Sequence, residues 1–268
     1  MRKSYLYSIV VLCSLFLQID LKGQNLVPNG DFEVYDTCPN NGGQISYSTP
    51  WYSPTTATPD YLNQCSTIFS VPFNPGGYQY ARTGVAYAGI ACYFYPSFSS
   101  YREYIQVQLT DSLIAQKKYC ITFYVNLADT HSSTYNIVAI TEIGLYLSDN
   151  SISSSFQLPL PFIPQITSPT NVYLSDTANW VEVSGNYIAQ GGEKFITIGN
   201  FKNDTLINTT TIVNNNGIPL AYYYIDDVSV VDCTGVGVTE LGIRNIPKPC
   251  NRPPHPNPLQ RRGERSYS

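Results

Sequence analysis

Acidic side chains in the middle of the chain are the residues that could carry out catalysis. They are Glu103, Asp129, Glu142, Glu182 and Glu193. Glycosidases place two such carboxylates on either side of a cleft, one to protonate the leaving group and one to act as base or nucleophile. The sequence leaves the distances between these carboxylates open, so a polysaccharide-degrading enzyme is one interpretation.

Other motifs of catalysis are absent from the sequence. The chain has no nucleophile elbow, no HExxH, no Gly-rich phosphate loop and no His/Cys/Asp spacing typical of a catalytic metal. Arg102 and Glu103 are adjacent in an alternating stretch, where a solvated cross-strand ion pair is the ordinary explanation. We therefore expect a protein without enzyme activity.

Aromatic side chains in the loops offer a second kind of chemistry, the stacking of ring faces against sugars. The chain has 23 Tyr, and its Pro-, Gly- and Asn-rich stretches carry Trp51, Tyr52, Tyr61 and Tyr78. We expect these four to bind ligand. Each also has an alternative role, because Tyr and Trp suit half-buried packing in loops and strands.

The N-terminus has the pattern of an export signal. A basic start at residues 1–3 precedes an apolar run over residues 5–17 and a small-residue cleavage site before Gln24. The run is shorter than the roughly 20 residues that span a bilayer, so we expect cleavage rather than a membrane anchor. A secreted or cell-surface protein without a membrane span follows.

Export sets the interpretation of the cysteines. Beyond residue 23 they number six, with no CxxC: Cys38, Cys65, Cys92, Cys120, Cys233 and Cys250. An even number of cysteines in an oxidising compartment favours disulfides over metal thiolates. Cys38 and Cys65 flank a long irregular stretch and are expected to pair. A Cys120–Cys233 bridge between strands is the second prediction, and Cys92 and Cys250 stay unassigned.

Composition and patterning indicate an all-β protein. The formal net charge is −4 and the charged fraction 13%, which argues against nucleic acid as a partner. Seven segments are short, β-branched or aromatic, and bounded by turn residues: 86–95, 101–109, 119–127, 141–147, 180–188, 195–201 and 222–231. Residues 101–109 alternate cleanly, so one face of that strand should be buried and the other wet. Residues 38–75 are expected to be surface loops.

Two stretches carry a resemblance to a known fold family. Residues 25–33 (NLVPNGDFE) and 221–230 (AYYYIDDVSV) are similar to the first and last strands of galactose-binding-domain-like jelly rolls, which serve as carbohydrate-binding modules. The resemblance implies an all-β jelly-roll β-sandwich over residues 24–233. It carries no ligand residue onto this chain, because the subset of modules that it matches has no assigned ligand.

In such jelly rolls the first and last strands are neighbours, and a structural calcium ion is commonly held there. Calcium takes six to eight oxygen ligands. The matching carboxylates are Asp31 and Glu33 at one end and Asp226 and Asp227 at the other. The resemblance thus implies a Ca2+ site at these four residues. The alternative is that Asp31 and Asp226 only accept hydrogen bonds from turn and strand-end amides.

Residues 234–268 are expected to be a linker and a disordered tail. Residues 235–241 and 256–258 resemble the entry to a C-terminal sorting domain of type IX secretion, and a Pro- and Arg-rich run follows. Such a run cannot build a core, so a truncated or frameshifted tail is the interpretation.

The sequence therefore predicts a secreted, non-catalytic module that binds a polysaccharide or a cell-surface glycan. A structural adhesion or spacer domain without a small ligand is the alternative, and a polysaccharide-degrading enzyme is the second alternative. The sequence names neither the glycan nor the oligomeric state.

Overall fold

A computed structural model describes residues 23–94, 100–130 and 132–233. The chain separates into two units, Met1–Thr234 and Gly235–Ser268, and the described residues all belong to the first. The expected export signal of residues 1–23 lies outside the described residues apart from Gly23, and the expected linker and tail of residues 234–268 lie wholly outside them.

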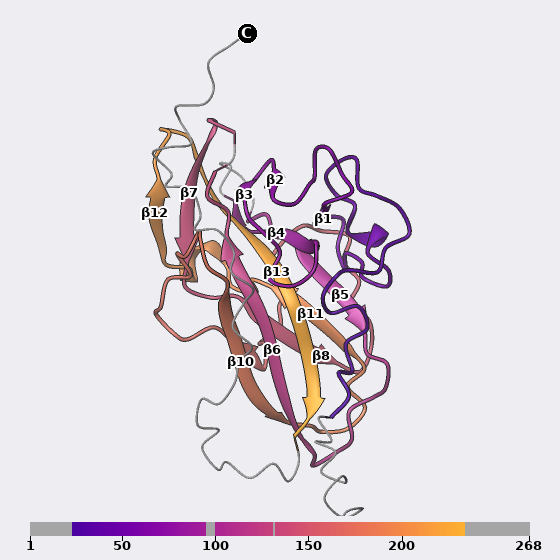
Figure 1. The fold of residues 1–268 in the computed structure, drawn as a ribbon. Helices are drawn as coiled ribbons and strands as arrows, with labels where there is room; N and C mark the ends of the chain where they lie inside the picture. Colours follow the sequence, from indigo (N-terminus) through magenta and orange to yellow (C-terminus); the bar gives the residue numbers. More distant parts are fainter. Residues whose placement is uncertain (1–22, 95–99, 131, 234–268) are drawn as a thin grey trace, which may run out of the picture. The chain divides into compact units, whose positions relative to one another are not determined.

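The larger of the two main sheets has five strands in the order β1 (Asp60–Asn63), β4 (Ala86–Phe94), β13 (Ile218–Asp232), β6 (Lys118–Leu127) and β10 (Val181–Ile188). Two further strands join it, because β7 (Tyr135–Ile140) pairs both with β12 (Thr209–Val213) and with the start of β13. The long yellow-orange β13 runs down the middle of this sheet in Figure 1.

The smaller sheet has the order β5 (Tyr104–Gln108), β11 (Phe195–Gly199), β8 (Gly144–Ser148) and β9 (Ile166–Thr167). A short hairpin, β2 (Phe73–Asn74) and β3 (Gly77–Tyr78), pairs only with itself. Two 3-10 turns complete the described elements, Ile45–Tyr47 and Asp204–Leu206. No helix among the described residues is long and apolar enough to cross a membrane.

The core lies between the two sheets. In β6 the buried residues alternate, so that Ile121, Phe123 and Val125 face inward. They belong to one apolar cluster with Leu145 of β8 and Ile196 of β11. Side chains of a strand point alternately to its two faces, and this is why each sheet can give one face to the core. The two packed sheets confirm the predicted jelly-roll β-sandwich.

All seven expected strands are present with shifted ends, but one prediction about their faces was wrong. Residues 101–109 were expected to be wet on one face, whereas Arg102, Glu103 and Gln106 are all buried. The outer face of this strand is covered by the segment around Leu160, which packs with Tyr104. Alternation showed that the residues point both ways, but it could not show that a loop covers the second face.

The solvated cross-strand ion pair expected at Arg102 and Glu103 is also wrong. Arg102 is fully buried, donates to the backbone oxygens of Tyr101 (2.8 Å) and Lys202 (3.1 Å), and forms its ion pair with Asp204. Burying a guanidinium is tolerated only when its donors meet acceptors. The Arg102–Asp204 ion pair therefore links the start of β5 to the turn at residues 204–206, and it does not lie on a solvated face.

Residues 38–75 were expected to be surface loops, but part of this stretch belongs to the sheet and the core. This stretch contains β1, and it sends Trp51 and Tyr61 into the core with 1% and 0% exposure. Trp51 stacks on Phe32 with ring centroids 5.0 Å apart. The polar composition of residues 38–75 gave no indication that these two aromatic residues are buried. They fix a long irregular segment to the sandwich.

Both predicted disulfides are confirmed. Cys38 bonds to Cys65, and Cys120 on β6 bonds to Cys233 just beyond β13, while Cys92 is free and buried. The first and last segments of the domain are neighbours, as predicted. The amide of Leu26 donates to the oxygen of Val230 (2.9 Å), although residues 25–33 form no regular strand.

Candidate functional site

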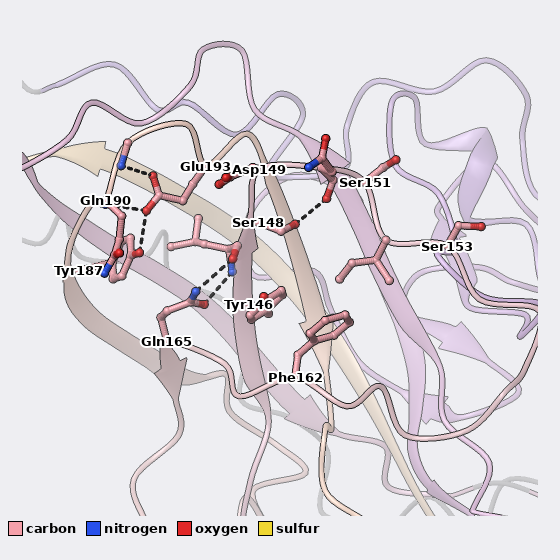
Figure 2. A pocket seen from close by; sticks show the side chains of 14 residues that line it. Tyr146, Ser148, Asp149, Ser151, Ser153, Phe162, Gln165, Tyr187, Gln190 and Glu193 are labelled. Carbon is pink, nitrogen blue, oxygen red and sulfur yellow. Dashed lines mark hydrogen bonds between the residues drawn. The ribbon is translucent and has the colours of Figure 1, made fainter.

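A groove of about 760 Å³ opens on the outer side of the smaller sheet. This volume is in the range typical of small-ligand sites. Its walls come from β8 and the chain that follows it, from the end of β10, and from the turn before β11 (Figure 2). Its lining residues are Tyr146, Leu147, Ser148, Asp149, Asn150, Ser151, Ile152, Ser153, Phe162, Gln165, Tyr187, Gln190, Gly191 and Glu193.

A pair of stacked aromatic rings forms one part of the groove. Tyr146 points outward because it alternates along β8 with Leu145 and Leu147, which are in the core. Phe162, from a Pro-rich segment, stacks on it with ring centroids 4.7 Å apart and an interplanar angle of 16°. Both rings are half-buried, so each keeps part of its surface at the groove.

A hydrogen-bonded carboxylate forms the opposite part. Glu193 accepts from the Tyr187 hydroxyl (2.6 Å) and from the amides of Gln190 (2.7 Å) and Gly191 (2.9 Å). Burial pushes the pKa of Glu193 upward, but the bond from Tyr187 and the amide bonds outweigh it, so its pKa is lowered. Burial and the negative charge of Glu193 raise the pKa of Tyr187. The acid therefore stays ionised and the phenol stays neutral.

Polar residues without internal partners form the rim between these two parts. Asp149, Asn150, Ser151 and Ser153 are all exposed. The side chains of these four accept or donate no hydrogen bond among the residues that the structure describes. They are free to meet hydroxyl groups of a ligand.

The path of the rim is set by two side-chain amides, one buried and one exposed. Gln106 of β5 is fully buried, and it holds Ile152 through both of its backbone groups, accepting from the amide (3.0 Å) and donating to the carbonyl (3.1 Å). Gln165 holds Leu147 in the same two-sided way, at 2.8 and 3.0 Å. Such paired bonds replace the missing strand partner, so the groove is preformed.

The four aromatic residues expected to bind ligand do not line this groove. Trp51 and Tyr61 are buried, with their polar atoms donating to the oxygens of Asn29 (2.8 Å) and Phe32 (2.9 Å), so neither offers a ring face to a ligand. Their assignment as ligand residues is corrected on this ground. The type of these side chains suggested recognition, but their burial assigns them to the core.

Tyr52 and Tyr78 lie closer to solvent. The Tyr52 hydroxyl accepts from Gln106 (2.8 Å), the same side chain that holds the groove rim. Tyr78 belongs to the hairpin, packs against the 69%-exposed ring of Phe73 at 4.5 Å, and donates to the Tyr80 hydroxyl at 3.0 Å. A role of either residue in binding stays a prediction.

The residues expected to hold calcium do gather at one end of the larger sheet. The negative charges of Asp31 and Asp227 both raise the pKa of Glu33, after burial, which is the largest cause. Burial, then the charge of Asp227, raises the pKa of Asp226 well above its ordinary value. Carboxylates that repel one another in this way would be stabilised by a cation.

The oxygens of these carboxylates, however, already accept hydrogen bonds. Asp226 accepts from the amides of Arg82 (2.8 Å) and Asp227 (2.7 Å), and Glu33 from the amides of Val85 (2.7 Å) and Ala86 (3.0 Å). Asp227 forms an ion pair with Arg82. Among the described residues, no group of three or more His, Cys, Asp or Glu is placed to hold a metal ion. This arrangement does not fit a calcium cage, and calcium stays a prediction.

The five candidate catalytic carboxylates are dispersed and engaged. Glu142 forms an ion pair with Lys202, and Glu182 accepts from the Tyr124 hydroxyl (2.8 Å). Asp129 accepts from the amide of Tyr78 in the hairpin (3.3 Å). The fourth, Glu193, lines the groove, and the fifth, Glu103, is buried and accepts from the amide of Ala91 on β4 (2.7 Å). Among the five, Glu193 is the one that the groove lining contains.

One feature of the sequence indicates the position of the groove. Tyr146 lies between Leu145 and Leu147 in a segment expected to be a strand, so alternation alone places its ring away from the core. The polar run at residues 148–155 follows directly.

Comparisons with known proteins give structural neighbours only. No family model and no curated protein matches the chain. The CBM22-1 xylan-binding domain of Xyn10C from Paenibacillus barcinonensis is 12% identical, with 80% of this chain and 97% of that chain covered and a TM-score of 0.40. TmCBM61, solved with β-1,4-galactotriose, is 14% identical, with coverage of 78% and 99% and a TM-score of 0.37. The K3 cleaved adhesin domain of Lys-gingipain from Porphyromonas gingivalis w83 is 15% identical, with coverage of 78% and 96% and a TM-score of 0.35. Similarities at this level identify no ligand.

Proposed function

We propose that the protein is a secreted, non-catalytic module that binds carbohydrate in the groove of the smaller sheet. The observation that supports this most directly is the stacked pair Tyr146 and Phe162 beside a rim of polar side chains that have no internal partner. The ligand class that this fits is a polysaccharide or a cell-surface glycan.

The chemistry of sugars requires both kinds of surface at once. A pyranose has a face of C–H groups, which are attracted to the negative π-face of an aromatic ring. Around its edge it has hydroxyl groups, which need donors and acceptors when they leave water. The half-buried rings supply the first surface, and Asp149, Asn150 and Ser151 supply the second. The arrangement of Glu193, with its oxygens bonded by three donors, supports a role in shaping the groove rather than in acid–base catalysis.

The compartment is part of the proposal. Two disulfides form in the described part of the chain, and disulfides persist in oxidising environments outside the cytosol. A secreted or surface-attached protein would meet polysaccharide there.

The test is titration calorimetry of the full chain with soluble β-1,4-galactan, β-1,4-mannan, mixed-linkage β-glucan and xylan. Phe162→Ala removes one ring of the stack and should weaken binding at least about ten-fold, which corresponds to about 1.4 kcal/mol. Phe156→Ala is the matched control, because Phe156 is 66% exposed on the same segment and does not line the groove. It should bind as the wild type does.

Thermal melting of both variants separates loss of binding from loss of fold. If none of the four polysaccharides binds to the wild-type chain, the proposal is wrong and a structural adhesion or spacer domain becomes the better account. If Phe156→Ala loses as much affinity as Phe162→Ala, binding takes place elsewhere on the surface.

A further inference from the structure

The groove has a one-sided charge. Its 14 lining residues include two acids, Asp149 and Glu193, and contain neither Lys nor Arg. A site that takes carboxylated or sulfated sugars would be expected to offer a guanidinium or an ammonium group, which pairs with such anions. The lining offers the opposite charge.

The charge of Glu193 is fixed in place. Its side chain accepts hydrogen bonds from one hydroxyl and two amides, and these bonds lower its pKa. A carboxylate held by three donors stays ionised through neutral pH. A ligand in the groove therefore meets this negative charge whatever the ligand is.

The charge of Asp149 lies at the same part of the groove and faces solvent. Asp149 lies against the turn that carries Glu193, since its carboxylate oxygens would be 3.9 Å from a Cβ built on Gly192. Its charge also contributes to the raised pKa of Tyr187, whose hydroxyl donates to Glu193. Within the described residues its carboxylate meets no hydrogen-bond donor and no cation. Figure 2 shows both acids beside each other at this part of the groove.

We propose that the groove selects uncharged glycans and excludes glycans with uronate or sulfate groups, with Asp149 as the residue that determines this selection. This inference rests on the proposed carbohydrate-binding function of the same groove. Like charges repel, and the effect is largest where both charges leave water.

The test compares two forms of one polysaccharide. The β-1,4-galactan, β-1,4-mannan or β-glucan that binds best is oxidised at its C6 hydroxymethyl groups to carboxylates, so that charge is the main difference. Two like charges about 4 Å apart in water change an association constant roughly five-fold. We therefore expect the oxidised form to bind the wild-type chain at least about five-fold more weakly than the neutral form.

Asp149→Asn removes the exposed charge and keeps the shape of the side chain. It should reduce the ratio of the neutral to the oxidised affinity about five-fold, whereas the loss of a hydrogen bond to the sugar would weaken both forms alike and leave that ratio unchanged. Asp36→Asn is the matched control, because Asp36 is exposed and outside the groove lining, and removes the same net charge. Raising the salt to about 0.5 M should shrink the difference between the two polysaccharides in the wild type.

The outcomes separate the two proposals. If no neutral polysaccharide binds, the carbohydrate-binding function fails and the selection fails with it. If the neutral form binds and the oxidised form binds equally well, or if Asp149→Asn does not change their ratio, the function stands and the selection by charge is overturned. An equal gain from Asp36→Asn would assign the effect to net charge instead of to the groove.

Discussion

The two main sheets each carry aromatic and polar side chains on the outer side, and a covered region on the larger sheet contrasts with an open groove on the smaller one. The covered face is the part of the outer side of the larger sheet where Tyr87, Tyr222 and Tyr224 lie under the chain of residues 64–83. The open groove is the one on the smaller sheet. The same residue types therefore serve two purposes in one molecule.

The difference lies in where the hydroxyl groups find partners. On the covered face, Tyr224 donates to Asn74 (2.7 Å), Tyr87 to the oxygen of Gln79 (2.9 Å), and Tyr222 to Asp60 (2.5 Å). On the rim of the open groove, Ser151 and Ser153 have no such partner among the described residues. A hydroxyl group that is hydrogen-bonded within the protein indicates a structural role. A hydroxyl group without such a bond, beside an exposed aromatic ring, indicates ligand recognition.

The largest expected effect comes from Tyr224→Ala on the covered face. Tyr224 is 1% exposed and packs against the ring of Tyr87 with centroids 4.8 Å apart. Replacing a buried aromatic residue by Ala should lower the free energy of unfolding by about 3 to 5 kcal/mol. Urea denaturation measures this, and Tyr224→Phe, which loses only the bond to Asn74, should cost about 1 kcal/mol. A folded Tyr224→Phe that no longer binds glycan would show that the covered face takes part in recognition.

The buried acid Glu103 should make stability depend on pH. Burial, then the charge of Asp60, raises the pKa of Glu103 from 4.5 to about 7. Because the folded-state pKa is the higher one, the folded protein binds the extra proton between pH 4.5 and about 7. The contribution of Glu103 is therefore most favourable below pH 4.5, falls as the pH rises to about 7, and is constant above; the whole change is at most about 3 kcal/mol.

Urea unfolding from pH 4.5 to 8 checks this, with Glu103→Gln as the variant that no longer titrates. The difference in unfolding free energy between wild type and variant should shift in favour of the variant as the pH rises. Glu182→Gln, at an exposed site on β10, should follow the wild type at every pH. A difference between wild type and Glu103→Gln that stays constant over this range would contradict the raised pKa.

On the open groove, a polar side chain should matter for binding and not for stability. Ser151→Ala removes a hydroxyl group that has no hydrogen bond among the described residues, so the unfolding free energy should change by less than about 0.5 kcal/mol. If the hydroxyl meets a sugar, its loss should weaken glycan binding by up to about five-fold, as expected for one neutral hydrogen bond. Melting and calorimetry on the same sample check both halves. A clear drop in stability would mean that the rim is as internally satisfied as the covered face.

The sequence was sufficient for the sandwich and both disulfides, because strand patterning and export chemistry are local signals. It was not sufficient for the groove. Phe162 stacks on Tyr146, and the segment between them is held at Ile152 by Gln106, which is 46 residues away along the chain on β5. It was not sufficient for the covered face either, since the burial of Tyr87 and Tyr224 depends on the chain of residues 64–83, which lies far from β13 in the sequence. Long-range covering of a face has no periodic signal along the chain.

The smallest expected effect concerns calcium, and it compares the carboxylate cluster with both faces. Asp226 and Glu33 each accept amide hydrogen bonds, and Asp227 pairs with Arg82, so these acids are internally satisfied like the hydroxyl groups of the covered face. A ligand that binds only the folded state raises the melting temperature, and by more the further its concentration exceeds its dissociation constant. From this arrangement we expect 1 mM EDTA or 5 mM CaCl2 to shift the melting temperature by less than about 1 °C, because acids that already have partners gain little from the metal. A stabilisation of 1 kcal/mol would shift a domain of this size by about 2 to 4 °C. A fall of several degrees in EDTA, reversed by calcium and abolished in Asp226→Asn, would instead show that the calcium site implied by the fold resemblance exists. The carboxylates would then give up their bonds to backbone amides and bind the metal. Hydrogen bonds made within the protein would indicate a structural role less reliably at this end of the sandwich than on its two faces.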